Sequence, residues 1–237
     1  MSEMLDFRQE GGRANQRSRT RDAILHAGAS LLRQGATPTV VEAAAAARVS
    51  QATAYRYFPT QDSLLSAVVD AEMRSALDVL DETLEPAGNA EEDILQLAEA
   101  IFEEIFIREP EHRSLLRLAL DHWFLQHTGK EADGAVDRGG RISFIVDALE
   151  PLRARIGEAS LFRLAEALSL AIGIESHLVL RDVWMLPKAQ ALDVISWTCR
   201  ALIRQALAES GKGKLSVAPA AKKALVRSRR RRAQNRT

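Results

Sequence analysis

The chain has 237 residues with 32 basic and 32 acidic side chains, so its formal net charge is zero. This length is enough to bury a sizeable core in one large or two modest domains. The single cysteine, Cys199, excludes an intramolecular disulfide and suits a buried apolar position. There is no run of about 18 uncharged apolar residues and no signal peptide, so we expect a cytoplasmic protein without a membrane span.

The zero net charge conceals a strong asymmetry along the chain. Residues 1–64 contain eight basic and six acidic side chains, whereas residues 65–210 contain 14 and 26. From residue 211 to the end there are ten basic side chains and no acidic one. A neutral total therefore does not exclude nucleic acid as a partner.

The first expected element is a helix over TRDAILHAGASLLRQG, residues 20–35, preceded by a flexible arm over residues 1–16. Gly35 suits the C-terminal cap of this helix. Its apolar stripe at helical spacing consists of Ile24, Gly28, Leu31 and Leu32.

A second helix is expected to start at Thr39, because Thr39 and Glu42 have the spacing of a capping box. Its alanine run allows another helix to approach closely. Arg48 and Val49 then form a corner, and Ser50 is a good N-cap for the next helix.

The third helix extends only from about Gln51 to Tyr57, because Pro59 cannot continue it. Thr60 then caps a fourth helix. A helix, a three-residue corner and a second helix make a helix-turn-helix, whose second helix lies in the major groove of DNA. The alternative is an ordinary corner between two helices of an all-helical domain. The polar residues of the short helix favour the DNA-binding interpretation.

The segment RVSQATAYRYFPTQDSLL resembles the helix-turn-helix signature of the tetracycline-repressor (TetR) family of bacterial regulators, and the resemblance extends over roughly Arg17 to Val69. It implies an all-α fold with an N-terminal three-helix DNA-binding domain, residues 17–66. A larger helical domain for effector binding and dimerisation, residues 67–210, would follow.

The resemblance also implies roles for individual residues. Two positions depart from the family pattern: Arg48 replaces a glycine, which requires a conformation near positive φ or a different turn, and Gln61 replaces a lysine. The residues expected to contact DNA are Arg17, Arg19, Thr39, Arg48, Ser50, Gln51, Ala52, Thr53, Tyr55, Arg56, Tyr57, Thr60 and Gln61.

The rest of the chain is expected to be helical, because we find no convincing β alternation. The expected helices are 61–84, 90–108, 110–127, 141–150, 160–181 and 188–208, with a glycine-rich loop over residues 128–140. The last two helices are apolar on more than one face. By resemblance to the family they would form a homodimer interface, and burial within one chain is the alternative.

The resemblance implies a pocket for an unknown small-molecule effector among the middle helices. Plain core positions are the alternative for each candidate, because aromatic stripes at helical spacing are common in cores. The candidate lining residues are Phe102, Phe106, Leu116, Leu120, Trp123, Phe124, Phe144 and His177.

Catalytic and metal-binding motifs are not found, so we expect neither an enzyme nor a cofactor or metal. The sequence predicts instead a DNA-binding regulator, most simply a ligand-responsive repressor that binds a palindromic double-stranded operator. An activator, or a helical binding or scaffold protein that has lost DNA recognition, remains an alternative. The basic tail, residues 211–237, is expected to be disordered, and either adds affinity for DNA or is a solubilising extension.

Overall fold

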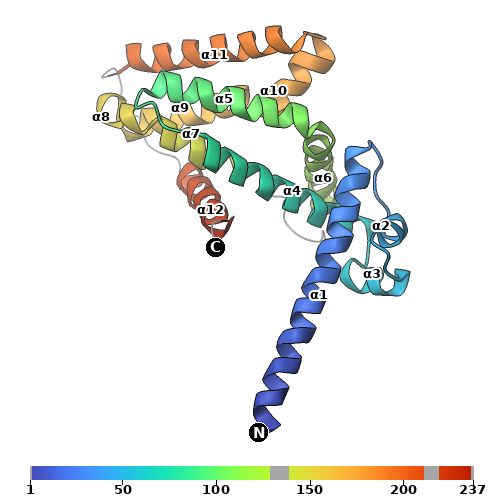
Figure 1. Ribbon diagram of the computed structural model, residues 1–237. Coiled ribbons are helices and arrows are strands. Elements are labelled where there is room, and N and C mark those ends of the chain that lie inside the picture. The colour runs from blue at the N-terminus through green and yellow to red at the C-terminus, as the bar shows by residue number, and fades with distance from the viewer. Residues whose placement is uncertain (1, 129–138, 211–218, 236–237) are drawn as a thin grey trace. The chain divides into compact units, whose positions relative to one another are not determined.

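The computed structural model describes residues 2–128, 139–210 and 219–235, which form helices and no strand (Figure 1). The predicted all-α class is confirmed. The chain divides into two compact units. Unit 1 comprises Met1–Met73 and Pro110–Val136, and unit 2 comprises Arg74–Glu109 and Asp137–Thr237.

Unit 1 contains three helices and parts of two more. They are α1 (Ser2–Arg33), α2 (Val40–Ala46), α3 (Gln51–Tyr57), the first part of α4 (Gln61–Thr83) and most of α6 (Glu109–His127). Its core includes Ile24 of α1, Ala43 of α2, Ala54 of α3 and Leu64 of α4. Gly28 allows α1 to approach α4, because a Cβ atom there would lie 2.8 Å from Val68 Cγ2.

Unit 2 contains the remaining helices around a larger apolar core. They are the end of α4, α5 (Ala90–Ile107), α7 (Ile142–Ala148), η1 (Glu150–Leu152), α8 (Arg153–Ile156), α9 (Glu158–Ala171), α10 (Ile174–Leu178), the π-helix η2 (Val179–Val183), α11 (Lys188–Ala208) and α12 (Pro219–Asn235). Helix α11 packs against α5 and α9. Cys199 is fully buried there as predicted, and burial raises the pKa of its thiol to about 11.

Several predicted boundaries are confirmed. Helix α3 spans residues 51–57 and α11 spans residues 188–208, as expected. The seventh expected helix is shorter than predicted, because α7 ends at Ala148 and Pro151 lies in the separate turn η1. The expected loop at residues 128–140 lies largely outside the described residues.

The expected helix over residues 160–181 is wrong, because α9 ends at Ala171 and α10 begins at Ile174. Ser176 stabilises this break. Its hydroxyl donates to the carbonyl oxygens of Ala171 at 2.7 Å and Gly173 at 2.9 Å. Backbone groups released from the helix are thus hydrogen-bonded by a nearby side chain.

Both predicted flexible ends are also wrong in the described residues. Residues 2–16 belong to α1, since most of residues 2–10 favour helix and extend a helix whose later turns are packed. Residues 219–235 form α12 instead of a disordered tail, because Leu225 and Ser228 are buried against the rest of unit 2. Residues 211–218 lie outside the described part.

No helix in the described ranges is both long enough and apolar enough to cross a lipid bilayer.

Candidate nucleic-acid interface

The start of α2 is held by the capping box that the sequence predicts. The backbone N–H of Glu42 donates to Thr39 Oγ1 at 3.2 Å, and the backbone N–H of Thr39 donates to Glu42 Oε2 at 2.9 Å. The Thr39 hydroxyl also donates to the same carboxylate oxygen at 2.7 Å. These bonds lower the pKa of Glu42. Thr39 thus fixes the entry to α2, and its contact with DNA stays a prediction.

The corner after α2 has the geometry of a Schellman motif. The N–H of Val49 donates to the carbonyl of Ala44 at 3.0 Å, and the N–H of Arg48 donates to that of Ala45 at 3.1 Å. Arg48 has φ of 56°, in the left-handed region that glycine usually fills. Of the two expected alternatives, a positive φ or a different turn, the structure has the positive φ, and the side chain of Arg48 is exposed at the corner.

Helix α3 begins at Ser50, whose Oγ accepts from the N–H of Thr53 at 3.2 Å and lies 2.8 Å from Thr53 Oγ1. Of its seven residues only Ala54 is buried, and it anchors the helix in the core of unit 1. The other candidate side chains on and beside α3 are exposed or half-buried: Gln51, Ala52, Thr53, Tyr55, Arg56 and Tyr57. Such a helix presents hydrogen-bonding groups to its surroundings instead of an apolar face.

Tyr55 and Tyr57 differ in their surroundings. Tyr55 is 45% exposed, whereas Tyr57 packs partly against the core of unit 1. The Arg56 guanidinium carbon lies 5.4 Å from the centre of the Tyr57 ring, within reach of a cation–π contact. The two phenol groups and the guanidinium together offer donors of the kind that contact phosphates.

The N-terminus of α4 is held by reciprocal hydrogen bonds between Thr60 and Ser63. The N–H of Ser63 donates to Thr60 Oγ1 at 3.0 Å, and the N–H of Thr60 donates to Ser63 Oγ at 3.1 Å. Gln61 is exposed in the first turn, where the family pattern has a lysine. The candidate Thr60 therefore has a clear structural role, and Gln61 supplies an amide in place of a charge.

The arginines of α1 fall into two groups. Arg17 and Arg19 are exposed. Arg21 instead places its guanidinium carbon 5.6 Å from the centre of the Phe58 ring, which is buried directly after α3. Arg17 and Arg19 are thus available to a ligand of unit 1, while Arg21 contacts the helix-turn-helix itself.

The expected effector residues are divided among three places. Phe102, Phe106 and His177 form a ring cluster in unit 2, with His177 centred 5.4 Å from Phe102 and 5.1 Å from Phe106. His177 is fully buried, and its Nε2 lies 3.7 Å from Glu109 Oε1. This cluster resembles packed core more than an open pocket.

The other expected lining residues lie elsewhere. Four of them are on α6 in unit 1, where three have large exposed surfaces: Leu116, Leu120, Trp123 and Phe124. Phe144 belongs to unit 2 and contributes to a groove of about 120 Å³. The lining of an effector pocket by these residues stays a prediction.

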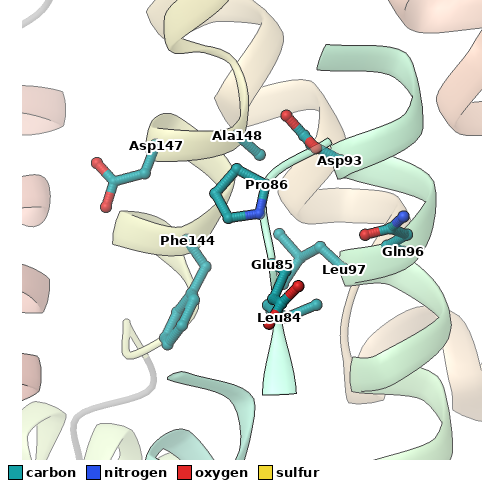
Figure 2. Close-up of a pocket in the computed structure, with 9 residues that line it drawn as sticks. All are labelled: Leu84, Glu85, Pro86, Asp93, Gln96, Leu97, Phe144, Asp147 and Ala148. Atoms are coloured by element: carbon teal, nitrogen blue, oxygen red, sulfur yellow. The ribbon is translucent and has the colours of Figure 1, made fainter. Parts of the chain in front are cut away.

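The groove beside Phe144 is lined by two helices and by the segment that follows α4 (Figure 2). Phe144, Asp147 and Ala148 of α7 line one side. The α5 side and the connecting segment contribute Asp93, Gln96, Leu97, Leu84, Glu85 and Pro86. Asp93 holds the connection, since its Oδ1 accepts from the N–H of Ala87 at 2.6 Å.

Sequence reasoning missed the contribution of the segment from Leu84 to Pro86, and no motif in the sequence identifies it.

A second apolar feature lies on α9, η2 and α11. Leu170 is 79% exposed and Trp197 is 68% exposed, and an open groove of about 300 Å³ lies between these elements. Val183, Trp184 and Met185 extend the exposed apolar surface. The expected dimer helices therefore leave large apolar side chains uncovered, which is typical of protein interaction surfaces.

The described residues contain no group of three or more metal-binding side chains in position to hold an ion.

Comparison with solved structures gives the fold. A TetR-family transcriptional regulator from Mesorhizobium loti superposes with a TM-score of 0.54 at 14% identity, over 80% of this chain and 97% of that one. The chain has the TetR-family fold. The TetR-like regulator LfrR from Mycobacterium smegmatis, solved in complex with proflavine, has a TM-score of 0.43 at 22% identity, over 79% and 97% of the two chains. No protein-family model and no curated protein sequence matches the chain.

The TetR-family fold accounts for the order of the elements in unit 1. The resemblance noted in the sequence covers α1 to α4, and the structural likeness extends over most of unit 2 as well. The family resemblance predicted from RVSQATAYRYF is thus supported at the level of fold.

Proposed function

We propose that this protein is a DNA-binding transcriptional regulator and not an enzyme. The observation that carries the proposal is α3, a helix held at its N-terminus by Ser50 and in the core by Ala54, with its polar residues exposed. An α-helix fits the major groove of B-DNA, where side-chain donors and acceptors distinguish base pairs. The TetR-family fold agrees with this function.

Within this function, α3 is the recognition helix. Gln51, Ala52 and Thr53 occupy its first turn, the part of a recognition helix that contacts base edges in helix-turn-helix proteins. Tyr55, Arg56 and Tyr57 follow, and their hydroxyl and guanidinium groups suit phosphate oxygens. The exposed Arg17, Arg19 and Arg48 add positive charge to the same unit.

We further propose that the protein acts as a homodimer on a palindromic operator. The support is the exposed apolar surface formed by Leu170, Val194 and Trp197, on the two helices expected to pair. A twofold axis places two copies of α3 in successive major grooves, about 34 Å apart. A stable interface of this kind covers about 800 Å² on each partner.

The regulator is proposed to be a repressor that releases DNA on binding a small molecule. Helix α4 contributes residues to both units and leads directly into the groove beside Phe144. A ligand in this groove can therefore shift the C-terminal end of α4, the helix whose N-terminal end at Gln61 follows the recognition helix. An activator would share all of these features.

Filling the groove tests the ligand response without a known effector. Ala148→Phe is expected to occupy the groove and to lower operator affinity about 5- to 150-fold, the usual range of allosteric coupling. The matched control, Ala148→Ser, should bind as the unchanged protein does. Equal affinity for the Phe and Ser variants, measured by fluorescence anisotropy, would exclude the groove as the effector site.

The recognition helix is tested by binding to duplexes selected from a random pool by the full-length protein. Thr53→Ala with Tyr55→Ala is expected to lower affinity for the selected duplex about 5- to 150-fold, since a base contact is worth about 1–3 kcal/mol. The control changes Gln126 and His127, two exposed polar residues of α6, to alanine. Equal affinity in both double variants would contradict the assignment of α3.

A further inference from the structure

The basic C-terminal helix α12 has two opposite faces, one packed and one exposed. Its inner face packs on α7 through Leu225 and Ser228, which are 8% and 1% exposed. Ser228 Oγ accepts from the N–H of Ser143 at 3.0 Å and donates to the carbonyl of Gly140 at 3.0 Å. The same hydroxyl lies 3.1 Å from Ser143 Oγ. These contacts fix the rotation of α12 about its own axis.

Two ion pairs hold one flank of α12. Lys222 Nζ lies 3.4 Å from Glu158 Oε2, and Arg229 Nη2 lies 2.7 Å from Asp147 Oδ1. These carboxylates neutralise two of the ten basic side chains that follow residue 210. The two cations on this flank are therefore neutralised, and their ion pairs hold the helix against unit 2.

Among the described residues, no such ion pair lies on the outer face of α12. Lys223, Arg227 and Arg230 are all exposed, and their spacing of four and three residues places them on one side of the helix. At 100° per residue this side lies opposite Leu225 and Ser228. The helix thus presents a stripe of three cations, the outer basic stripe, directed away from the unit that holds it.

We propose that the outer basic stripe binds the phosphate backbone of double-stranded DNA without regard to sequence. This inference rests on the proposed function and extends it, because it places a second DNA-binding surface in unit 2. The stripe spans about 10 Å at 1.5 Å per residue, long enough to contact more than one phosphate of a strand. Residues 211–237 contain no acidic side chain, so no carboxylate of α12 itself opposes the stripe.

The packing of α12 favours DNA over a lipid surface. A helix that lies in a membrane interface inserts an apolar face. In α12 the apolar side chain of Leu225 is already covered by the core of unit 2, and the outward side is basic. Val226 is the one large apolar side chain exposed among the described residues of α12, and a single residue makes no apolar face, so the basic surface suits a polyanion that is contacted through charge.

The test uses matched pairs of arginines in the full-length protein. Arg227→Gln/Arg230→Gln removes two cations of the stripe, and Arg155→Gln/Arg163→Gln removes two from the exposed surface of α8 and α9. Binding to a non-operator duplex is measured between about 50 and 200 mM salt. The slope of log affinity against log salt concentration should fall by about 2 in the stripe variant and by less than half as much in the control.

Equal slopes for the two variants would overturn the inference, while a wild-type protein that binds no duplex would contradict the proposed function itself. Circular dichroism must show equal helicity in both variants, and Lys223→Gln, which alters only the stripe, should lower the slope by about 1. Preference among selected duplexes should be unchanged, since phosphate contacts are independent of sequence. The inference would also be overturned if Arg227→Gln/Arg230→Gln lost binding to vesicles of anionic lipid while its salt slope for DNA binding stayed unchanged.

Discussion

Helices α3 and α12 are both short of apolar residues, yet they are held in place by different kinds of contact. Helix α3 is fixed by residues close to it in sequence: Ser50 bonds to Thr53, and the corner at Arg48 closes on Ala45. Helix α12 is fixed by partners 64 to 88 positions away. The difference explains why the cap at Ser50 and the proline at residue 59 suffice to locate α3, whereas the sequence of α12 predicts disorder.

The largest expected effect is on operator affinity, and it comes from a substitution that leaves α3 and α12 intact. Leu170→Glu places a charge in the exposed apolar surface of α9, so the proposed dimer should dissociate, because burying an unpaired charge is strongly unfavourable. Operator affinity should then fall at least about 100-fold, as each recognition helix binds a half-site alone.

Sedimentation velocity checks this expectation together with anisotropy. Val79→Glu is the control, since Val79 is also an exposed apolar residue of unit 2 but lies on α4. A dimer that survives Leu170→Glu would exclude this surface as the interface.

Because α12 is held by residues distant in sequence, the loss of one of these contacts should strongly lower the stability of the docked helix. Leu225→Ala removes a side chain buried in the core of unit 2 and should cost about 2–5 kcal/mol of the stability of the docked helix. Hydrogen exchange of residues 219–235 should then accelerate, while that of α3 stays unchanged.

Val226→Ala is the matched control on the same helix, because Val226 is 51% exposed. In the Val226→Ala variant the hydrogen exchange of residues 219–235 should match that of the unchanged protein. Protection of α12 that is equally strong in both variants would mean that Leu225 does not hold the helix.

The smallest expected effect concerns the local geometry before α3. Arg48 occupies the left-handed region at a measurable cost, so Arg48→Gly should raise the free energy of unfolding by up to about 1 kcal/mol. Arg48→Lys keeps the Cβ atom and should leave stability unchanged. Urea denaturation separates the two variants, and a glycine variant less stable than the lysine variant would contradict the geometry at this corner.

The local elements of unit 1 could be predicted because their signals lie within a few residues of one another. Thr39 with Glu42, Ser50 with Thr53, and the proline at residue 59 determine three boundaries through caps and steric exclusion. The family pattern, which has glycine at Arg48, leaves two alternatives, a positive φ or a different turn, and the structure has the first. The DNA contacts of these residues remain predictions.

The remaining features depend on contacts that no local pattern reports. The break between Ala171 and Ile174 is stabilised by Ser176, in a segment whose apolar periodicity favours one continuous helix. The groove beside Phe144 includes a connecting segment that has no recognisable motif. The predicted effector residues are large apolar or aromatic side chains and one histidine at helical spacing, and such spacing along single helices does not show which helices face each other.

The most direct test of the central claim is a hydroxyl-radical footprint on a selected duplex. If α3 enters the major groove in a dimer, the unchanged protein should protect two half-sites centred about 10 bp apart, on one face of the duplex. Thr53→Ala/Tyr55→Ala should abolish both protected regions at the same protein concentration. Protection that persists unchanged in this variant would contradict the claim that α3 is the DNA-binding helix.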